Sequence, residues 1–197
     1  MPELNQKYDW VKHLDVVLTF AVVSGRSVDD AVRTYGGNPA EPQLMTTVEA
    51  EDAALDDEGH AYVQVFAHQG AVVALENNSW SGTIPEIARR ASADGGHFFS
   101  VHWNVNGAFQ VVEADGGKVT AFFDPMRVGA NDPGEVQPAW LDDVHFEPGQ
   151  LRTACLTLVE RQSGIVFAQE WLVKKLPTYR IPDVDELFRS VEGASTP

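Results

Sequence analysis

The segment from residue 97 to residue 124, HFFSVHWNVNGAFQVVEADGGKVTAFFD, constrains the fold of this chain most strongly. Apolar residues occupy alternate, odd-numbered positions in three stretches, at 99–105, 109–111 and 119–123. A period of two is typical of a β-strand that buries one face. The segment therefore predicts three antiparallel strands that are joined by two tight turns.

The two turns must keep these apolar residues on one face of the sheet. Because directly paired residues share a face, odd positions must pair with odd positions, and each loop must contain an odd number of residues. Val105-Asn106-Gly107 and Asp115-Gly116-Gly117 meet this condition, with glycine third, where a three-residue hairpin loop needs a left-handed conformation. The predicted register places Trp103 opposite Phe109 and Phe109 opposite Phe123.

The same register predicts a second face that is mostly polar. Two successive rows of it are His102, Gln110 and Phe122, and then Asn104, Ala108 and Asp124. We expect this face to be exposed to solvent, since an antiparallel sheet commonly has one solvated face. Its side chains are also the best candidates for a binding site.

A further candidate region is the segment ENNSWSGTIPEIARRAS, which leads from a predicted hairpin at 61–77 into a helix. Turn-forming residues surround one large aromatic ring, Trp80, which is either a ligand platform or a lid over the core. Glu76 could perform acid-base chemistry with His102 or Asp124 if folding brought these groups together. The complete set of candidate binding residues is Glu76, Asn78, Trp80, His102, Asn104, Gln110, Phe122 and Asp124.

The composition excludes several classes of function. With 29 acidic and 14 basic residues the formal charge is −15, so nucleic acids and anionic membranes should be repelled. The chain has one cysteine and shows no signal-peptide pattern, and a cytoplasmic location is therefore expected. The six histidines show no metal-binding spacing, and the phosphate-binding and nucleophile motifs are missing from the sequence. We predict no catalytic residue, no metal site and no cofactor.

The expected fold is α+β, with a bent antiparallel sheet of about five or six strands built from hairpins and with helices packed mainly on one face. Residues 1–182 should form a single domain. Residues 183–197 should form an amphipathic segment followed by a disordered tail. The pattern at 165–176 fits either a strand or a helix.

Several segments together resemble an uncharacterised, mainly actinobacterial family of the domain-of-unknown-function kind. They are LTFAVVSG, a capped helix ending in YGG, ENNSWSG, SVHWNVNG, FFDP and a helix ending in RQSG. They cover most of residues 10–172. The family's central segment more often reads ENxGxxG, and Ser79 departs from that pattern. The resemblance implies a shared fold and no particular activity.

Two functional hypotheses follow from the sequence. The first is a non-catalytic protein-interaction domain of the immunity, regulatory or defence-associated kind. It would hold a basic protein partner on its polar face or on residues 77–82, which we call the Trp80 loop. The second is a small-ligand-binding protein or enzyme with a polar cleft near Trp80, His102 and Asn104. Convergence of these side chains on one pocket would favour the second hypothesis.

Overall fold

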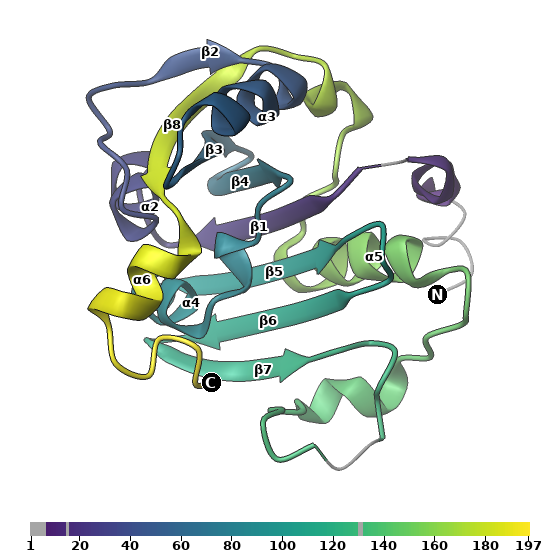
Figure 1. The fold of residues 1–197 in the computed structure, drawn as a ribbon. Coiled ribbons are helices and arrows are strands. Elements are labelled where there is room, and N and C mark those ends of the chain that lie inside the picture. Colours follow the sequence, from purple (N-terminus) through teal and green to yellow (C-terminus); the bar gives the residue numbers. More distant parts are fainter. Residues whose placement is uncertain (1–6, 15, 130–131) are drawn as a thin grey trace.

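A computed structural model describes residues 7–14, 16–129 and 132–197 of the chain. Within these residues the fold is α+β, with one open antiparallel sheet of eight strands in the order β2-β8-β3-β4-β1-β5-β6-β7 (Figure 1). The expectation of five or six strands was therefore too low. The first six residues of the expected domain 1–182 lie outside the described residues.

The bounds of the elements are as follows. The strands are β1 (Leu18–Ser24), β2 (Gln43–Met45), β3 (His60–His68), β4 (Ala71–Asn77), β5 (His97–Trp103), β6 (Phe109–Asp115), β7 (Lys118–Phe123) and β8 (Leu176–Pro182). The α-helices are α2 (Val28–Thr34), α3 (Thr47–Asp56), α4 (Pro85–Ser92), α5 (Leu151–Ser163) and α6 (Val184–Ser190). The 3-10 helices are η1 (Asp9–His13), η2 (Ser81–Thr83), η3 (Ala139–Asp143) and η4 (Gln169–Leu172).

The first predicted turn of the meander is confirmed. Trp103 pairs with Phe109, and the N–H of Asn104 donates to the carbonyl of Ala108 at 3.1 Å, which leaves the three-residue loop 105–107. This loop ends in Gly107, whose φ is +80°. The second turn is different from the prediction, because Asp115 pairs directly with Lys118 across a two-residue loop. Gly116 and Gly117 both have positive φ, as a tight two-residue hairpin turn requires.

The two-residue loop pairs odd residues with even ones, and a β-bulge in β7 restores the pairing of odd residues with odd residues. Ala114 pairs with Val119 and Glu113 with Ala121, which leaves Thr120 as the extra residue. Beyond the bulge Phe123 lies opposite Val111, so the predicted pairing of Phe109 with Phe123 was wrong. Beyond the bulge odd residues pair with odd residues, and Ala121 and Phe123 lie on the predicted face. Between the turn and the bulge Val119 pairs with Ala114 of the second face, so the face predicted for Val119 was wrong.

Both faces of the sheet are covered, which corrects the prediction of one solvated face and of helices mainly on one side. Leu18, Phe99 and Trp103 belong to a core that α5 and the segment 165–172 complete. Phe98 and Val112, from the face that was expected to be wet, belong to a second core with α2 and α4. Helices packed on both faces explain why the polar side chains of β5 are buried.

The C-terminal segment lies against this second face (Figure 1). Asp183 caps α6 by accepting a hydrogen bond from the backbone N–H of Glu186 at 2.8 Å. The tail, for which we expected disorder, lies along α4. The N–H of Glu86 donates to the carbonyl of Ala194, and Arg89 donates to the carbonyls of Gly193 and Thr196. Arg89 thus holds the last residues in place.

The ambiguous segment 165–176 is neither a long strand nor a long helix. It contains η4 and ends where β8 begins at Leu176. Phe167 and Trp171 from this segment are buried in the first core. Among the described residues, no helix combines the length and the apolar character that crossing a bilayer requires.

A pair of neighbouring core residues tests whether both faces are buried. Phe98 and Phe99 are each 0% exposed and point to opposite faces. Phe98→Ala and Phe99→Ala should each lower the free energy of unfolding by about 3–5 kcal/mol, because each leaves a cavity in a packed core. Urea denaturation measures both values. A nearly neutral Phe98→Ala beside a costly Phe99→Ala would mean that the second face is solvated.

Candidate functional site

A row of polar side chains crosses four strands on the second face. Glu76 of β4 pairs with Thr19 of β1, Thr19 pairs with His102 of β5, and His102 pairs with Gln110 of β6. Directly paired residues share a face, so all four side chains lie on one side of the sheet. Because β1 is inserted between β4 and β5, residues far apart in the sequence become neighbours.

The Glu76 carboxylate organises the loop that follows β4. It is 1% exposed and accepts hydrogen bonds from the N–H of Ser81 at 2.9 Å, the N–H of Gly82 at 2.7 Å and the hydroxyl of Ser79 at 2.7 Å. Burial raises the pKa of Glu76, and these donors partly offset that effect. The carboxylate therefore satisfies the N–H groups at the start of η2, and its role in this structure is to hold the loop.

Gly82 lets the loop approach the carboxylate closely. A Cβ at this position would lie 2.9 Å from the Tyr35 hydroxyl, 3.0 Å from Glu76 Oε1 and 3.0 Å from Thr19 Cγ2. Only glycine fits such a site without displacing its neighbours. The position of Trp80, two residues earlier, depends on this fit.

The Thr19 hydroxyl fixes the tautomer of His102. Thr19 donates its one hydroxyl proton to the carbonyl of Ser79 at 2.7 Å, and its oxygen lies 2.9 Å from His102 Nδ1. A carbonyl can only accept, so the hydroxyl proton is committed and Nδ1 must carry the proton of the second bond. The Nε2 atom of the neutral ring is then a hydrogen-bond acceptor, and it makes no hydrogen bond to any described residue.

Burial keeps His102 neutral. Its side chain is 8% exposed, and burial lowers its pKa from 6.5 to about 4. No carboxylate forms a hydrogen bond with the ring within the described part of the chain; Glu76 reaches it only through Ser79 and Thr19. At neutral pH the ring therefore acts as an uncharged acceptor.

A pocket of about 340 Å³ opens beside His102. We call it the His102 pocket; its walls come from β5, β6, β7, the Trp80 loop, the start of α4, α6 and the C-terminal tail. Its lining residues are Trp80, Thr83, Ile84, Pro85, His102, Asn104, Ala108, Phe109, Gln110, Phe122, Phe188 and Ser195. None of these described residues carries a formal charge, although the chain as a whole is strongly acidic.

The structure brings most of the candidate binding residues together. Trp80, His102, Asn104, Gln110 and Phe122 line the His102 pocket, and Glu76 lies behind it in the polar row. Phe122 is half-buried there and pairs with Val112, two residues away from its predicted partner Gln110.

The other two candidates also lie outside the pocket. Asn78, whose φ is +57°, lines a separate depression on the other side of the Trp80 loop, with His60 and Tyr62. Asp124 stabilises the next turn, where its Oδ1 accepts a hydrogen bond from the N–H of Met126. It does not line the His102 pocket.

Sequence reasoning missed several residues that build the site. Thr19 is the polar residue inside an apolar strand, LTFAVVSG, whose other polar residue, Ser24, is at the strand end, and that exception was a usable signal. Phe188 closes one wall from α6, where its ring centre lies 5.8 Å from that of Trp80. The sequence indicates that α6 is amphipathic but contains nothing that places it against Trp80.

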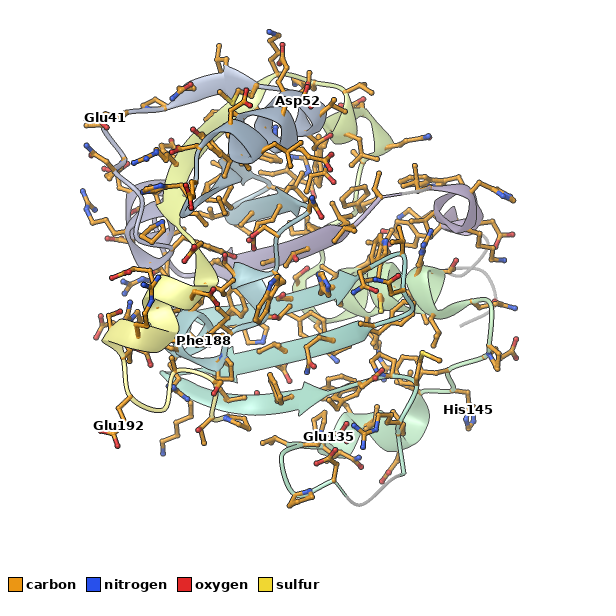
Figure 2. All side chains as sticks on the ribbon, in the orientation of Figure 1. Glu41, Asp52, Glu135, His145, Phe188 and Glu192 are labelled. Carbon is orange, nitrogen blue, oxygen red and sulfur yellow. The ribbon has the colours of Figure 1, made fainter. Side chains whose placement is uncertain are left out.

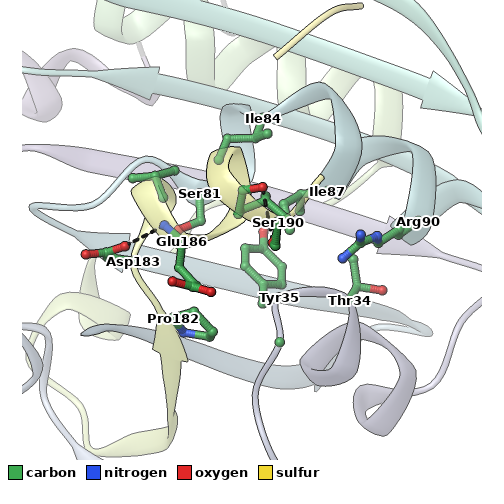
Figure 3. Close-up of a pocket in the computed structure, with 13 residues that line it drawn as sticks. Thr34, Tyr35, Ser81, Ile84, Ile87, Arg90, Pro182, Asp183, Glu186 and Ser190 are labelled. Carbon is green, nitrogen blue, oxygen red and sulfur yellow. Dashed lines mark hydrogen bonds between the residues drawn. The ribbon is translucent and has the colours of Figure 1, made fainter. Parts of the chain in front are cut away.

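A smaller hollow of about 160 Å³ lies beneath α6, next to the His102 pocket (Figure 3). It differs in character, because the charged residues Arg90, Asp183 and Glu186 line it. The Tyr35 hydroxyl is fully buried at this place and has no hydrogen-bond partner among the described residues. Since that hydroxyl is sealed from open space, the hollow offers a ligand mainly its charged rim.

Within the described residues, no group of three His, Cys, Asp or Glu side chains is arranged to hold a metal ion. The acidic side chains lie largely at the periphery, as Glu41, Asp52, Glu135 and Glu192 do in Figure 2. The negative charge is thus a property of the surface, and the pocket wall is uncharged.

Replacement of Gly82 tests the close approach at Glu76. Gly82→Ala should lower the free energy of unfolding by about 1–3 kcal/mol, because the added methyl group overpacks the site. In a Tyr35→Phe background the cost should be smaller, since the hydroxyl nearest to the new methyl group is gone. Chemical denaturation of the four proteins measures the coupling. Equal costs in both backgrounds would contradict the proposed contact.

The His102 pKa predicts a pH dependence of stability. Between pH 6.5 and about 4 the unfolded state binds a proton at this residue and the folded state does not. The contribution of His102 to the free energy of unfolding is therefore fully present above pH 6.5. It decreases as the pH falls to about 4, by at most about 3 kcal/mol. His102→Gln should weaken the pH dependence in this window, measured by urea denaturation at several pH values. An unchanged dependence would show that His102 is protonated normally.

Comparisons with known proteins do not place the chain in a family. A scan against protein-family models, a search of curated proteins and a search of solved structures each gave no match. Membership in the family that the sequence resembles stays a prediction. The geometry of the site is therefore the basis for any functional proposal.

Proposed function

We propose that this protein binds a small, uncharged, ring-bearing molecule in the His102 pocket. The observation that supports this proposal best is the contrast between an acidic surface and an uncharged, aromatic pocket wall. Aromatic side chains with a few placed polar groups are typical of small-molecule sites. The pocket's size, about 340 Å³, lies in the range of such sites.

The absence of charge in the wall selects against charged ligands. A charged group that enters such a site loses its hydration and finds no opposite charge to compensate. Rings from Trp80, Phe109, Phe122 and Phe188 instead offer faces and edges to a planar apolar group. His102 and the amides of Asn104 and Gln110 would orient that group by hydrogen bonds.

Binding is favoured over catalysis by the state of His102. An effective general base has a pKa near the working pH, and the pKa of His102 is lowered to about 4. The ring also lacks a bonded carboxylate partner among the described residues, and no hydroxyl nucleophile is positioned by its Nε2. These features suit an acceptor that recognises a ligand.

The protein-interaction hypothesis stays a prediction. It relied on an acidic surface and on exposed aromatic rings at Trp80 and Phe122. Trp80 is 42% exposed, but Phe122 packs partly against the second core and lines the pocket. The aromatic residues at this place therefore fit a pocket wall better than a flat docking surface.

A matched set of probes tests the proposal. Benzamide, benzoate and benzamidine have nearly the same shape and carry no charge, a negative charge and a positive charge, respectively. Benzamide should bind with a millimolar dissociation constant, as expected of a fragment. In two-dimensional NMR its shifts should cluster at the His102 pocket, and the two charged probes should bind more weakly. Stronger binding of benzoate or benzamidine at this place, or no localised shift with benzamide, would contradict the proposal.

Two lysine substitutions in one hairpin loop serve as variant and control. Ala108→Lys places a charge in the pocket wall and should abolish the benzamide shifts. Val105→Lys adds the same charge at a 57% exposed position that does not line the pocket, and should leave them unchanged. Equal effects of the two variants would show that the probe binds elsewhere.

A further inference from the structure

The hydrogen bonds of three polar side chains in the His102 pocket determine which end of each side chain is free for a ligand. The inference drawn from them rests on the proposed function. Each of three side chains has one end committed to the protein's own backbone or to Thr19. The uncommitted end is therefore fixed chemically as a donor or as an acceptor. For His102 the free end is Nε2, an acceptor, because Nδ1 donates to Thr19.

Gln110 also presents an acceptor. Its Nε2 donates to the backbone carbonyls of Val111 and Phe123, each at 3.2 Å. Carbonyl oxygens cannot donate, so the amide nitrogen must be the end that faces them. The Oε1 atom of Gln110 is left without a bond to any described residue.

Asn104 presents a donor. Its Oδ1 accepts hydrogen bonds from the N–H groups of Asn106 and Ala108, each at 2.9 Å, and thereby closes the hairpin loop. Backbone N–H groups cannot accept, so the oxygen must face them. The Nδ2 group is the end that remains for a ligand.

The register arranges these three groups in order. His102 lies directly opposite Gln110, with about 5 Å expected between such Cβ atoms, and Asn104 follows two residues later on the same face, about 7 Å along the strand. His102 therefore lies between the other two, next to Gln110 across the strands and next to Asn104 along the chain. The free groups are an acceptor on Gln110, an acceptor on His102 and a donor on Asn104.

We propose that the ligand is a neutral, planar nitrogen heterocycle whose edge presents two N–H donors and then a carbonyl acceptor. The donors would meet Gln110 Oε1 and His102 Nε2, and Asn104 Nδ2 would donate to the carbonyl. The aromatic walls would contact the ring itself. An exocyclic amine, a ring N–H and a carbonyl occur in this order on the edge of a guanine-type or pterin-type ring.

Three nucleosides with the same sugar test the predicted edge. Guanosine carries both donors and the carbonyl, inosine lacks the exocyclic amine, and adenosine has a ring acceptor in place of the ring N–H. Guanosine should bind about tenfold more tightly than inosine, because an unmet buried acceptor weakens binding, and adenosine should bind most weakly. Isothermal titration calorimetry on the full chain measures the three affinities.

An isosteric substitution tests the donor. Asn104→Asp keeps an oxygen for the two N–H groups of the loop and replaces the free amide nitrogen by a carboxylate oxygen. It should weaken guanosine binding by more than about tenfold while the thermal unfolding midpoint stays at the wild-type value. Asn106→Asp adds the same charge in the same loop outside the pocket, and it should leave the affinity nearly unchanged.

The outcomes separate this inference from the proposed function. If benzamide binds in the pocket but the three nucleosides do not differ, the donor and acceptor assignment is wrong and the small-ligand function stands. If neither benzamide nor any nucleoside binds, both are overturned. Preference for guanosine that Asn104→Asp removes and Asn106→Asp retains would support the assignment.

Discussion

The site depends on one buried carboxyl group. A carboxylate that is removed from water must be matched by donors, and Glu76 is matched by the loop that follows its own strand. This requirement fixes the start of η2 and, through Gly82, the distance between the loop and the sheet. Trp80 is then held at the edge of the second face. Without this anchor, the pocket would lose a wall.

The same loop determines the chemistry of His102. The carbonyl of Ser79 accepts a hydrogen bond from the Thr19 hydroxyl, and the Thr19 oxygen in turn accepts one from Nδ1–H of the ring. A loop that is held by a carboxylate therefore sets which nitrogen of a histidine faces the pocket. The imidazole stays neutral because it is buried, as the proposed role in ligand recognition requires. This coupling explains why polar residues on four strands belong to one site.

Much of the meander was predictable because its information is local. The spacing from Trp103 to Phe109 and the glycine between them determined the first hairpin and its faces. For the second hairpin the faces of Ala121 and Phe123 were predicted correctly, but the register and the face of Val119 were not, since a tight loop plus a bulge restores parity beyond the bulge as well as a three-residue loop does. Parity alone cannot distinguish these two solutions. The candidate residues His102, Asn104 and Gln110 followed directly from the first hairpin.

The solvated face was predicted wrongly for a physical reason. Ser100 and His102 are polar, and polar residues in alternation usually indicate water. Here Ser100 is 0% exposed, because α4 and α2 cover that face. The alternation of polar and apolar residues distinguishes the two faces of a strand. It does not indicate which helix, distant in the sequence, covers each face. Phe188 was missed for the same reason, and Thr19 because the pairing of β1 with β5 joins segments that are distant in the sequence.

The sequence by itself determined the strands of the meander, the faces of the first hairpin, the amphipathic C-terminal helix and most of the polar residues that line the pocket. These features depend on neighbours a few residues apart, where backbone geometry restricts the choices. Tertiary structure alone decided that β1 lies between β4 and β5 and that α6 closes the pocket. Those arrangements depend on burying the apolar faces of whole elements, and many pairings of elements satisfy the same local pattern.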